Sequence, residues 1–244
     1  MKQSTQDNTK NNDVQDQVCR VLAFTCSKHR PLFIRHSVLQ VQSQTHPTDH
    51  AVYINSPSAK NAEDKTNYQE LLKDITPKEG TSIQIGYGNS VNQHNNHIAA
   101  LNMIKINDYD LFLKIDDDDI YKTNYVSDIV NSFNSDSWDF SGEYAHGILN
   151  GIHLEKNVIL KCLGENENDK KHNVIPMMPG TYAFSRKAIQ YIIDEINCKN
   201  IFEDPLWRLL MTQKEDIKVE CRDSKNYIYH IHGNNISTGH LLKK

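Results

Sequence analysis

The sequence predicts an α/β protein built on a mostly parallel, Rossmann-like sheet with helices on both faces. Three observations support this fold class. Short apolar runs alternate with segments whose apolar residues recur at helical spacing, which is the order that parallel strands with crossover helices produce. A central apolar run leads without a break into four carboxylates, Asp116–Asp119. The last third of the chain is less regular and predicts a smaller antiparallel part.

Length and composition predict one domain. At 244 residues the chain can bury one substantial core. Residues 1–17 are almost wholly polar and predict a flexible tail, so the domain is expected over 18–244. No apolar run approaches the length that spans a bilayer. The formal net charge of -4 argues against general nucleic-acid binding, which needs clustered Lys and Arg.

The cysteines indicate the compartment. The five cysteines are scattered without a CxxC pair, which fits neither a disulfide framework nor a zinc site. The N-terminus also shows no apolar signal segment. Together these features predict a reducing cytoplasm.

In the first half, strands and helices are expected in strict alternation. Pro31 suits the first turn of a helix, and Ile34, Val38 and Val41 then share one helical face. The expected strands cover 21–24, 51–54, 82–85 and 110–115, and the expected helices cover 31–41, 68–75 and 98–104. In a parallel sheet the carboxyl ends of strands meet at the ligand-binding edge. Thr25, Asn55 and the four aspartates should therefore converge there.

The second half mixes helices with shorter strands. Apolar spacing predicts a helix over 126–133, and residues 139–160 alternate enough to suggest antiparallel strands. A polar loop is expected at 162–173. Further elements are a strand at 181–184, a helix at 189–196, a helix beginning within 202–210, and late strands at 217–219 and 227–232.

The run of four aspartates allows two interpretations. Adjacent like charges repel, so a fold that keeps them at a strand end often supplies a cation, and Mg²⁺ or Mn²⁺ prefers oxygen ligands. Alternatively, the run is a solvated acidic loop that caps the next helix. The run alone does not decide between them.

Several segments, in order, resemble the family 2 type of GT-A glycosyltransferase. These segments are Thr25 with Arg30-Pro31, Gln44-Thr45-His46-Pro47, Asn102, the DxD-like run Phe112–Asp119, Gly180–Arg186, Glu203-Asp204 and His232–Asn235. Ordered agreement of weak motifs is stronger than any one motif. The chain departs from the family pattern at Asn55-Ser56, where an acidic pair is frequent, and at Leu101, where Arg is usual. The run before the aspartates also resembles the β-1,3-galactosyltransferase type.

The resemblance implies a GT-A-like single domain, with a nucleotide-sugar half at 18–119 and an acceptor half at 120–244. It implies the following roles: nucleotide-sugar binding by Thr25, Arg30, Asn55, Asn102, Asp116 and Asp117; metal binding by Asp118, Asp116 and His232; and catalysis by Asp204 with Glu203. Asp204 would act as the general base on the acceptor hydroxyl. Glu203 and Glu143 are the alternative candidates for this base. His232 could equally be a strand-end histidine, and Glu203-Asp204 could cap a helix before Pro205.

The implied function is an inverting glycosyltransferase that depends on Mn²⁺ or Mg²⁺. It would move a sugar from a nucleotide-sugar donor to a glycan or glycolipid acceptor in surface polysaccharide biosynthesis, at the cytoplasmic face of the membrane. One alternative is a sugar nucleotidyltransferase, although residues 25–31 contain none of the glycines such a loop uses to hold a triphosphate. Another is a non-catalytic glycan-binding domain of the same fold.

Overall fold

The computed structural model describes most of the chain between Val18 and Ile231. The described residues are 18–28, 30–55, 62–88, 93–143, 146–149, 152–154, 177–199, 204–222 and 226–231. The tail expected at 1–17 and the loop expected at 162–173 lie outside these ranges. No helix within them is long and apolar enough to cross a bilayer.

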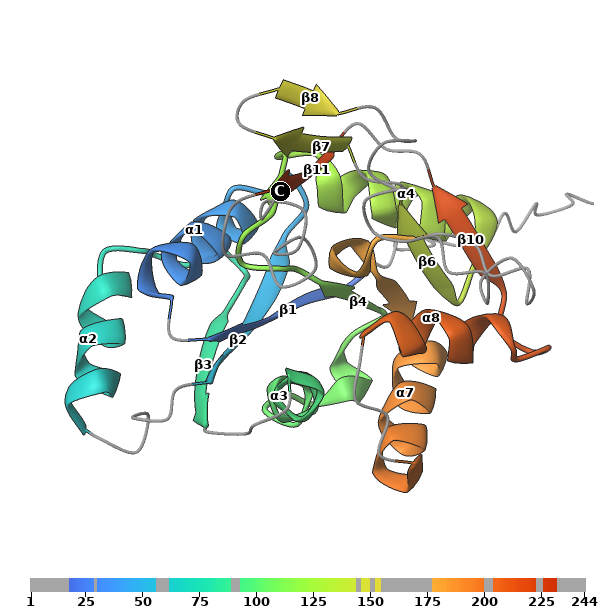
Figure 1. Ribbon diagram of the computed structural model, residues 1–244, viewed down its shortest axis with the longest axis horizontal. Coiled ribbons are helices and arrows are strands. Elements are labelled where there is room, and N and C mark those ends of the chain that lie inside the picture. Colours follow the sequence, from blue (N-terminus) through green and yellow to red (C-terminus); the bar gives the residue numbers. More distant parts are fainter. Residues whose placement is uncertain are drawn as a thin grey trace, which may run out of the picture.

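A seven-stranded sheet forms the centre of the molecule (Figure 1). Its strands, in spatial order, are β10 (Val219–Arg222), β6 (Phe140–Glu143), β9 (Ala183–Ser185), β4 (Leu111–Lys114), β1 (Val21–Lys28), β2 (Thr48–Asn55) and β3 (Ile83–Gly88). Strand β9 runs antiparallel to both of its neighbours, and every other pair is parallel. The predicted mostly parallel sheet is confirmed.

Helices cover both faces of this sheet, as predicted. They are α1 (Pro31–Gln42), α2 (Ala62–Leu72), α3 (Gln93–Leu101), α4 (Tyr125–Asp136), α7 (Arg186–Lys199) and α8 (Asp204–Thr212), with short 3-10 turns η1 (Ile106–Asp108) and η2 (Pro179–Thr181). Val21 and Ala23 of β1 pack in the cluster that contains residues of α1 and α4. Leu22 and Phe24 pack in the cluster of α3, α7 and α8 (Figure 1). This is the alternation expected of a strand buried on both sides.

A second, four-stranded sheet lies beside the first. Its order is β5 (Ile120–Tyr121), β11 (Tyr227–Ile231), β7 (His146–Leu149) and β8 (Ile152–Leu154). Two of its pairs are antiparallel, but β11 and β7 are parallel. The smaller antiparallel part is therefore present, with one parallel pair inside it.

The segment 139–160 was expected to hold antiparallel strands, and β7 and β8 within it do pair in antiparallel fashion. Strand β6, from the same segment, joins the main sheet. It pairs in parallel with β10 and antiparallel with β9. All four residues of β6 are buried, so the strand is stabilised by apolar neighbours on two faces rather than by a hairpin partner.

A buried histidine ties β2 to β1 and α1. The Nε2 atom of His50 lies 2.9 Å from Oγ1 of Thr25, which lies 3.2 Å from the Ser37 hydroxyl. The His50 side chain is fully buried, and its Nδ1 atom has no hydrogen-bond partner among the described residues. Burial lowers the pKa of His50 to about 3, so the folded protein holds this ring neutral.

This geometry predicts a pH-dependent stability. Below about pH 6.5 the unfolded chain protonates His50 and the folded chain does not, so this residue lowers the free energy of unfolding progressively from pH 6.5 towards pH 3. In His50→Gln this loss is absent, and at pH 5 the parent's extra loss is about 2 kcal/mol. Urea unfolding of both proteins at pH 7 and pH 5 measures the difference. Parallel pH profiles would contradict the assignment.

Candidate functional site

The carboxyl ends of six strands meet at one edge of the main sheet. Strands β1, β2, β3 and β4 are parallel, and β6 runs in the same direction as β4 because both are antiparallel to β9. Strand β10 follows β6 in parallel. The edge therefore collects Lys28, Asn55, the four aspartates after β4, Glu143 and Arg222.

The four aspartates alternate between buried and partly exposed. Asp117 and Asp119 are each 1% exposed. By contrast, the side chains of Asp116 and Asp118 are 27% and 16% exposed. The run is therefore not uniformly solvated: two of its carboxylates belong to the interior and two can meet a ligand.

Asp117 organises the loop after β1. Its carboxylate accepts hydrogen bonds from the Ser27 hydroxyl and from the Arg30 guanidinium. Burial raises the pKa of Asp117 to about 7, against the opposing effect of Arg30. The resemblance placed Asp117 among the donor contacts. Its buried carboxylate instead holds Arg30, which lies at the edge itself.

Asp119 ties the run to the second sheet. Its carboxylate accepts hydrogen bonds from the Tyr227 hydroxyl at 2.6 Å and from the backbone N–H of His230 at 3.1 Å, both on β11. Burial, reinforced by the charges of Asp116 and Asp118, raises the pKa of Asp119 well above its ordinary value. The side chain of Gln40 on α1 donates to the Asp119 carbonyl at 2.9 Å. This carboxylate therefore has a structural role.

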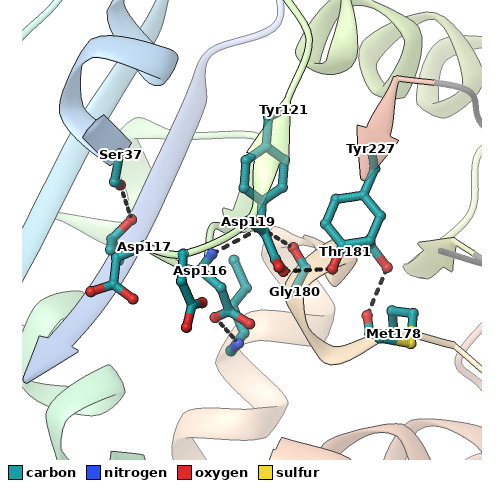
Figure 2. A network of polar contacts seen from close by, with 12 residues as sticks. Ser37, Asp116, Asp117, Asp119, Tyr121, Met178, Gly180, Thr181 and Tyr227 are labelled. Carbon is teal, nitrogen blue, oxygen red and sulfur yellow. Dashed lines mark hydrogen bonds and ion pairs between the residues drawn. The ribbon is translucent and has the colours of Figure 1, made fainter. Parts of the chain in front are cut away.

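The turn before β9 closes the network (Figure 2). The Tyr121 hydroxyl accepts from the Asp116 backbone N–H at 2.9 Å and donates to the Gly180 carbonyl at 2.8 Å. A Cβ atom on Gly180 would lie 2.6 Å from an oxygen of Asp119 and 3.0 Å from one of Asp116. Only glycine allows this close approach, so the segment 179–181 packs directly against the aspartates.

Two side-chain cations compensate the carboxylates. Arg30 contacts Asp117 and donates to Asp118 at 2.9 Å, and the ammonium of Lys114 pairs with Asp116. The repulsion that argued for a metal ion is thus partly relieved by these two cations. Sequence reasoning missed Lys114 as a site residue. A lysine inside the otherwise apolar strand run 111–115 was the available signal.

Thr25 and Asn102 do not lie beside the partly exposed aspartates. The Thr25 side chain is fully buried and lies within hydrogen-bond distance of Ser37 and His50. Its hydroxyl therefore points into the protein interior and not towards a nucleotide-sugar site. Asn102 follows α3, which returns the chain from the carboxyl end of β3 to the start of β4. It therefore lies at the opposite edge of the sheet, away from the aspartates. Asn55, the last residue of β2, does lie at the aspartate edge and is half-buried.

The candidate catalytic residues are only partly described. Helix α8 begins at Asp204, but the Asp204 side chain, Glu203 and His232 lie outside what the structure describes. One turn later, the buried Trp207 ring packs on His97, with ring centroids 5.2 Å apart, and His97 packs on Phe24 at 6.0 Å. Phe24 pairs in register with Lys114. These contacts anchor the start of α8 on the sheet face that carries Phe24.

Glu143 is not well placed as a base. Its side chain is fully buried, and one carboxylate oxygen lies 3.4 Å from the Arg222 guanidinium. A base must reach the proton of an acceptor hydroxyl that arrives from solvent. Glu143 therefore has a structural role, as the buried partner of Arg222.

The residues present fit a divalent cation in part. Among the described residues, no three His, Cys, Asp or Glu side chains are grouped to hold a metal. Asp116 and Asp118 nevertheless offer partly exposed carboxylates, which hard cations prefer. Lys114 pairs with Oδ1 of Asp116, while Oδ2 faces Gly180. Asp116 and Asp118 can therefore supply part of a ligand set. A bound cation would compete with Lys114 for Asp116 and with Arg30 for Asp118.

A shallow hollow at the opposite edge is not the candidate site. It has a volume of about 430 Å³, and Asp110, Asp139, Arg186 and Lys187 are among its lining residues. Arg186 pairs with Asp110 at 2.9 Å and Lys187 with Asp139 at 3.6 Å. The charges in this hollow therefore compensate one another.

The fold is GT-A-like, because it matches solved structures of GT-A-type glycosyltransferases. Three of the similar structures are TarS from S. aureus in complex with UDP-GlcNAc, the mannosyltransferase PcManGT from Pyrobaculum calidifontis in complex with GDP-Man and Mn²⁺, and 4-diphosphocytidyl-2C-methyl-D-erythritol synthase from Anaerococcus prevotii. Their TM-scores are 0.59, 0.60 and 0.60, at 11%, 9% and 12% sequence identity. Identities this low show the shared fold alone.

The extent of the match differs among these structures. This chain is covered to 89%, 88% and 92%, and the other chains to 60%, 58% and 97%, in the same order. In a longer TarS structure, the chain spans only 37% of the TarS length. No protein-family model and no curated protein sequence matches this chain.

Proposed function

We propose that this protein is a glycosyltransferase that binds a nucleotide-sugar donor at the carboxyl edge of the main sheet. One observation carries the proposal. Asp117 and Asp119 are fixed inside the protein, and this arrangement leaves Asp116 and Asp118 partly exposed, two residues apart, at the end of the central strand. Ligands of parallel α/β sheets bind at this edge. The donors named with the similar structures, UDP-GlcNAc and GDP-Man, support this class of ligand.

In the proposed donor complex, Arg30 lies near the diphosphate and Asn55 near the nucleoside, at the ends of β1 and β2. Asp116 and Asp118 would hold Mn²⁺ or Mg²⁺, with His232 as a third ligand. The bound cation would stabilise the charge of the departing diphosphate as a Lewis acid. The protein itself fixes both carboxylates, because Lys114, Arg30 and the Tyr121 hydroxyl set the conformation of the loop that carries them.

Asp204 is the proposed general base, with Glu203 beside it in the sequence. It would take the proton from the acceptor hydroxyl as that oxygen attacks the anomeric carbon opposite the diphosphate. A single displacement inverts the anomeric configuration. The proposed acceptor is a glycan or glycolipid in surface polysaccharide biosynthesis, at the cytoplasmic face of the membrane, with peripheral membrane contact and no nucleic-acid partner.

Two alternatives share this fold. The diphosphocytidyl synthase structure matches this chain over 97% of the synthase's own length. This match makes a nucleotidyltransferase the second candidate function. Against it, residues 25–31 carry no glycine to hold a triphosphate. A non-catalytic glycan-binding domain would not require Asp116 and Asp118 as partly exposed carboxylates, each paired with a cationic side chain. The transferase therefore fits the site best.

A thermal-shift panel tests donor binding. We expect at least one diphosphate of uridine, guanosine, cytidine or thymidine, with Mn²⁺, to raise the melting temperature by about 5 °C at 100 times its dissociation constant. The matching nucleosides serve as controls and should give little shift, because they lack the diphosphate. If no nucleotide shifts the transition with or without Mn²⁺, the donor site is wrong.

A further inference from the structure

Lys114 is a charged side chain in the interior of the central sheet. Its side chain is fully buried, and its ammonium pairs with Asp116, whose side chain is 27% exposed. Lys114 shares one side of β4 with Phe112, which packs in the cluster of α3, α7 and α8. Leu111, Leu113 and Ile115 pack on the opposite side, in the cluster that contains residues of α1 and α4. The buried partner of this ion pair is thus the cation, and the accessible partner is the carboxylate.

Such a residue needs a reason, because burying an ammonium is costly and an apolar side chain of similar volume would pack well. The backbone of Lys114 is fixed independently: its N–H donates to the Tyr182 carbonyl at 2.8 Å, and the strand continues the ladder with β1. The fold therefore does not depend on the ammonium to form this strand. Its clearest contribution is to Asp116, which stands where a ligand would arrive.

We propose that Lys114 is a positioning residue that competes with a divalent cation for Asp116 and so lowers the affinity of the empty donor site for metal. The proposal rests on the proposed function of this edge as a donor site. A cation that binds Asp116 must share the carboxylate with a buried like charge that has no route to solvent. Arg30 places a second positive charge at Asp118. A nucleoside diphosphate adds negative charge at the same place and relieves this repulsion, so the metal is retained mainly together with the nucleotide.

The test compares Lys114→Met with Lys114→Arg. The methionine has similar length and no charge, while the arginine keeps the charge. Mn²⁺ binding is titrated without nucleotide, by electron paramagnetic resonance of the free ion. We expect Lys114→Met to bind Mn²⁺ at least about tenfold more tightly than the parent, and Lys114→Arg to stay within about threefold of it. A merely structural lysine predicts the opposite direction, because a disturbed site binds metal more weakly.

Removing Lys114 leaves Asp116 partly hydrated, so a folded variant is expected, and a melting curve checks it. Should Lys114→Met not fold, Lys114→Gln replaces it with the same expectation. Mn²⁺ affinity equal to or weaker than the parent in a folded, uncharged variant would overturn the proposal. Nucleotide binding is measured in parallel on each protein: failure of every nucleoside diphosphate to bind would reject the donor site, whereas unchanged Mn²⁺ affinity with intact nucleotide binding would reject only the role of Lys114.

Discussion

Replacing Asp204 by asparagine is expected to lower the rate of sugar transfer by roughly 10²-fold or more while donor affinity stays almost unchanged. A general base contributes in the transition state, and an amide cannot accept the proton. Asparagine is nearly as good a helix N-cap as aspartate, so the melting temperature should also stay close to that of the parent. Transfer rate, donor affinity and melting temperature measured on the same variant separate catalysis from capping.

The matched control for this variant is Glu215→Gln, an exposed carboxylate in the turn after the same helix. It should transfer sugar at the parent rate. If Asp204→Asn also does so, Asp204 is a cap, and the search for a base moves to Glu203.

Asp118→Asn is expected to remove the metal dependence of nucleotide binding and to weaken binding at saturating Mn²⁺ by more than tenfold. The amide has the same shape but is a weaker ligand of a hard cation. Because the Asp118 side chain is partly exposed and shares Arg30 with Asp117, the fold should survive. Isothermal titration with and without Mn²⁺ measures both effects.

The neighbouring variant Asp117→Asn provides the contrast. Asp117 is buried against Ser27 and Arg30, so its replacement should affect stability and leave the metal dependence in place. An Asp118→Asn protein that binds nucleotide with unchanged metal dependence would show that Asp118 only completes the ion pair with Arg30.

The fold was predictable where local pattern and long-range pairing agree. The apolar run Val21–Phe24 indicates a strand, and the spacing of Ile34, Val38 and Val41 indicates a helix. The alternation of such elements then predicts a parallel sheet with crossover connections. The positions of β6 and β10 were not predictable in this way. Their partners lie about eighty residues apart in the chain, and nothing in a strand of four residues identifies such a neighbour.

The position of the four aspartates at the edge of the sheet was predictable from the sequence. Which of the four carboxylates are buried was not. A buried strand that runs into Asp116–Asp119 marks the edge of the sheet, and Arg30 follows the neighbouring strand. Which carboxylates turn inward depends on donors from distant elements, such as Ser27 for Asp117 and Tyr227 for Asp119. For the same reason the Thr25 hydroxyl, expected to meet a ligand, is bonded to His50 inside the fold.

The most direct test of the central claim is product analysis by phosphorus NMR. The protein is incubated with Mn²⁺ and nucleotide sugars and, separately, with nucleoside triphosphates and sugar 1-phosphates. We predict that a nucleotide sugar is converted to its nucleoside diphosphate, slowly with water and faster with an accepting glycan, and that triphosphates are left intact. Release of pyrophosphate from a triphosphate and a sugar 1-phosphate, with every nucleotide sugar stable, would contradict the assignment and identify a nucleotidyltransferase instead.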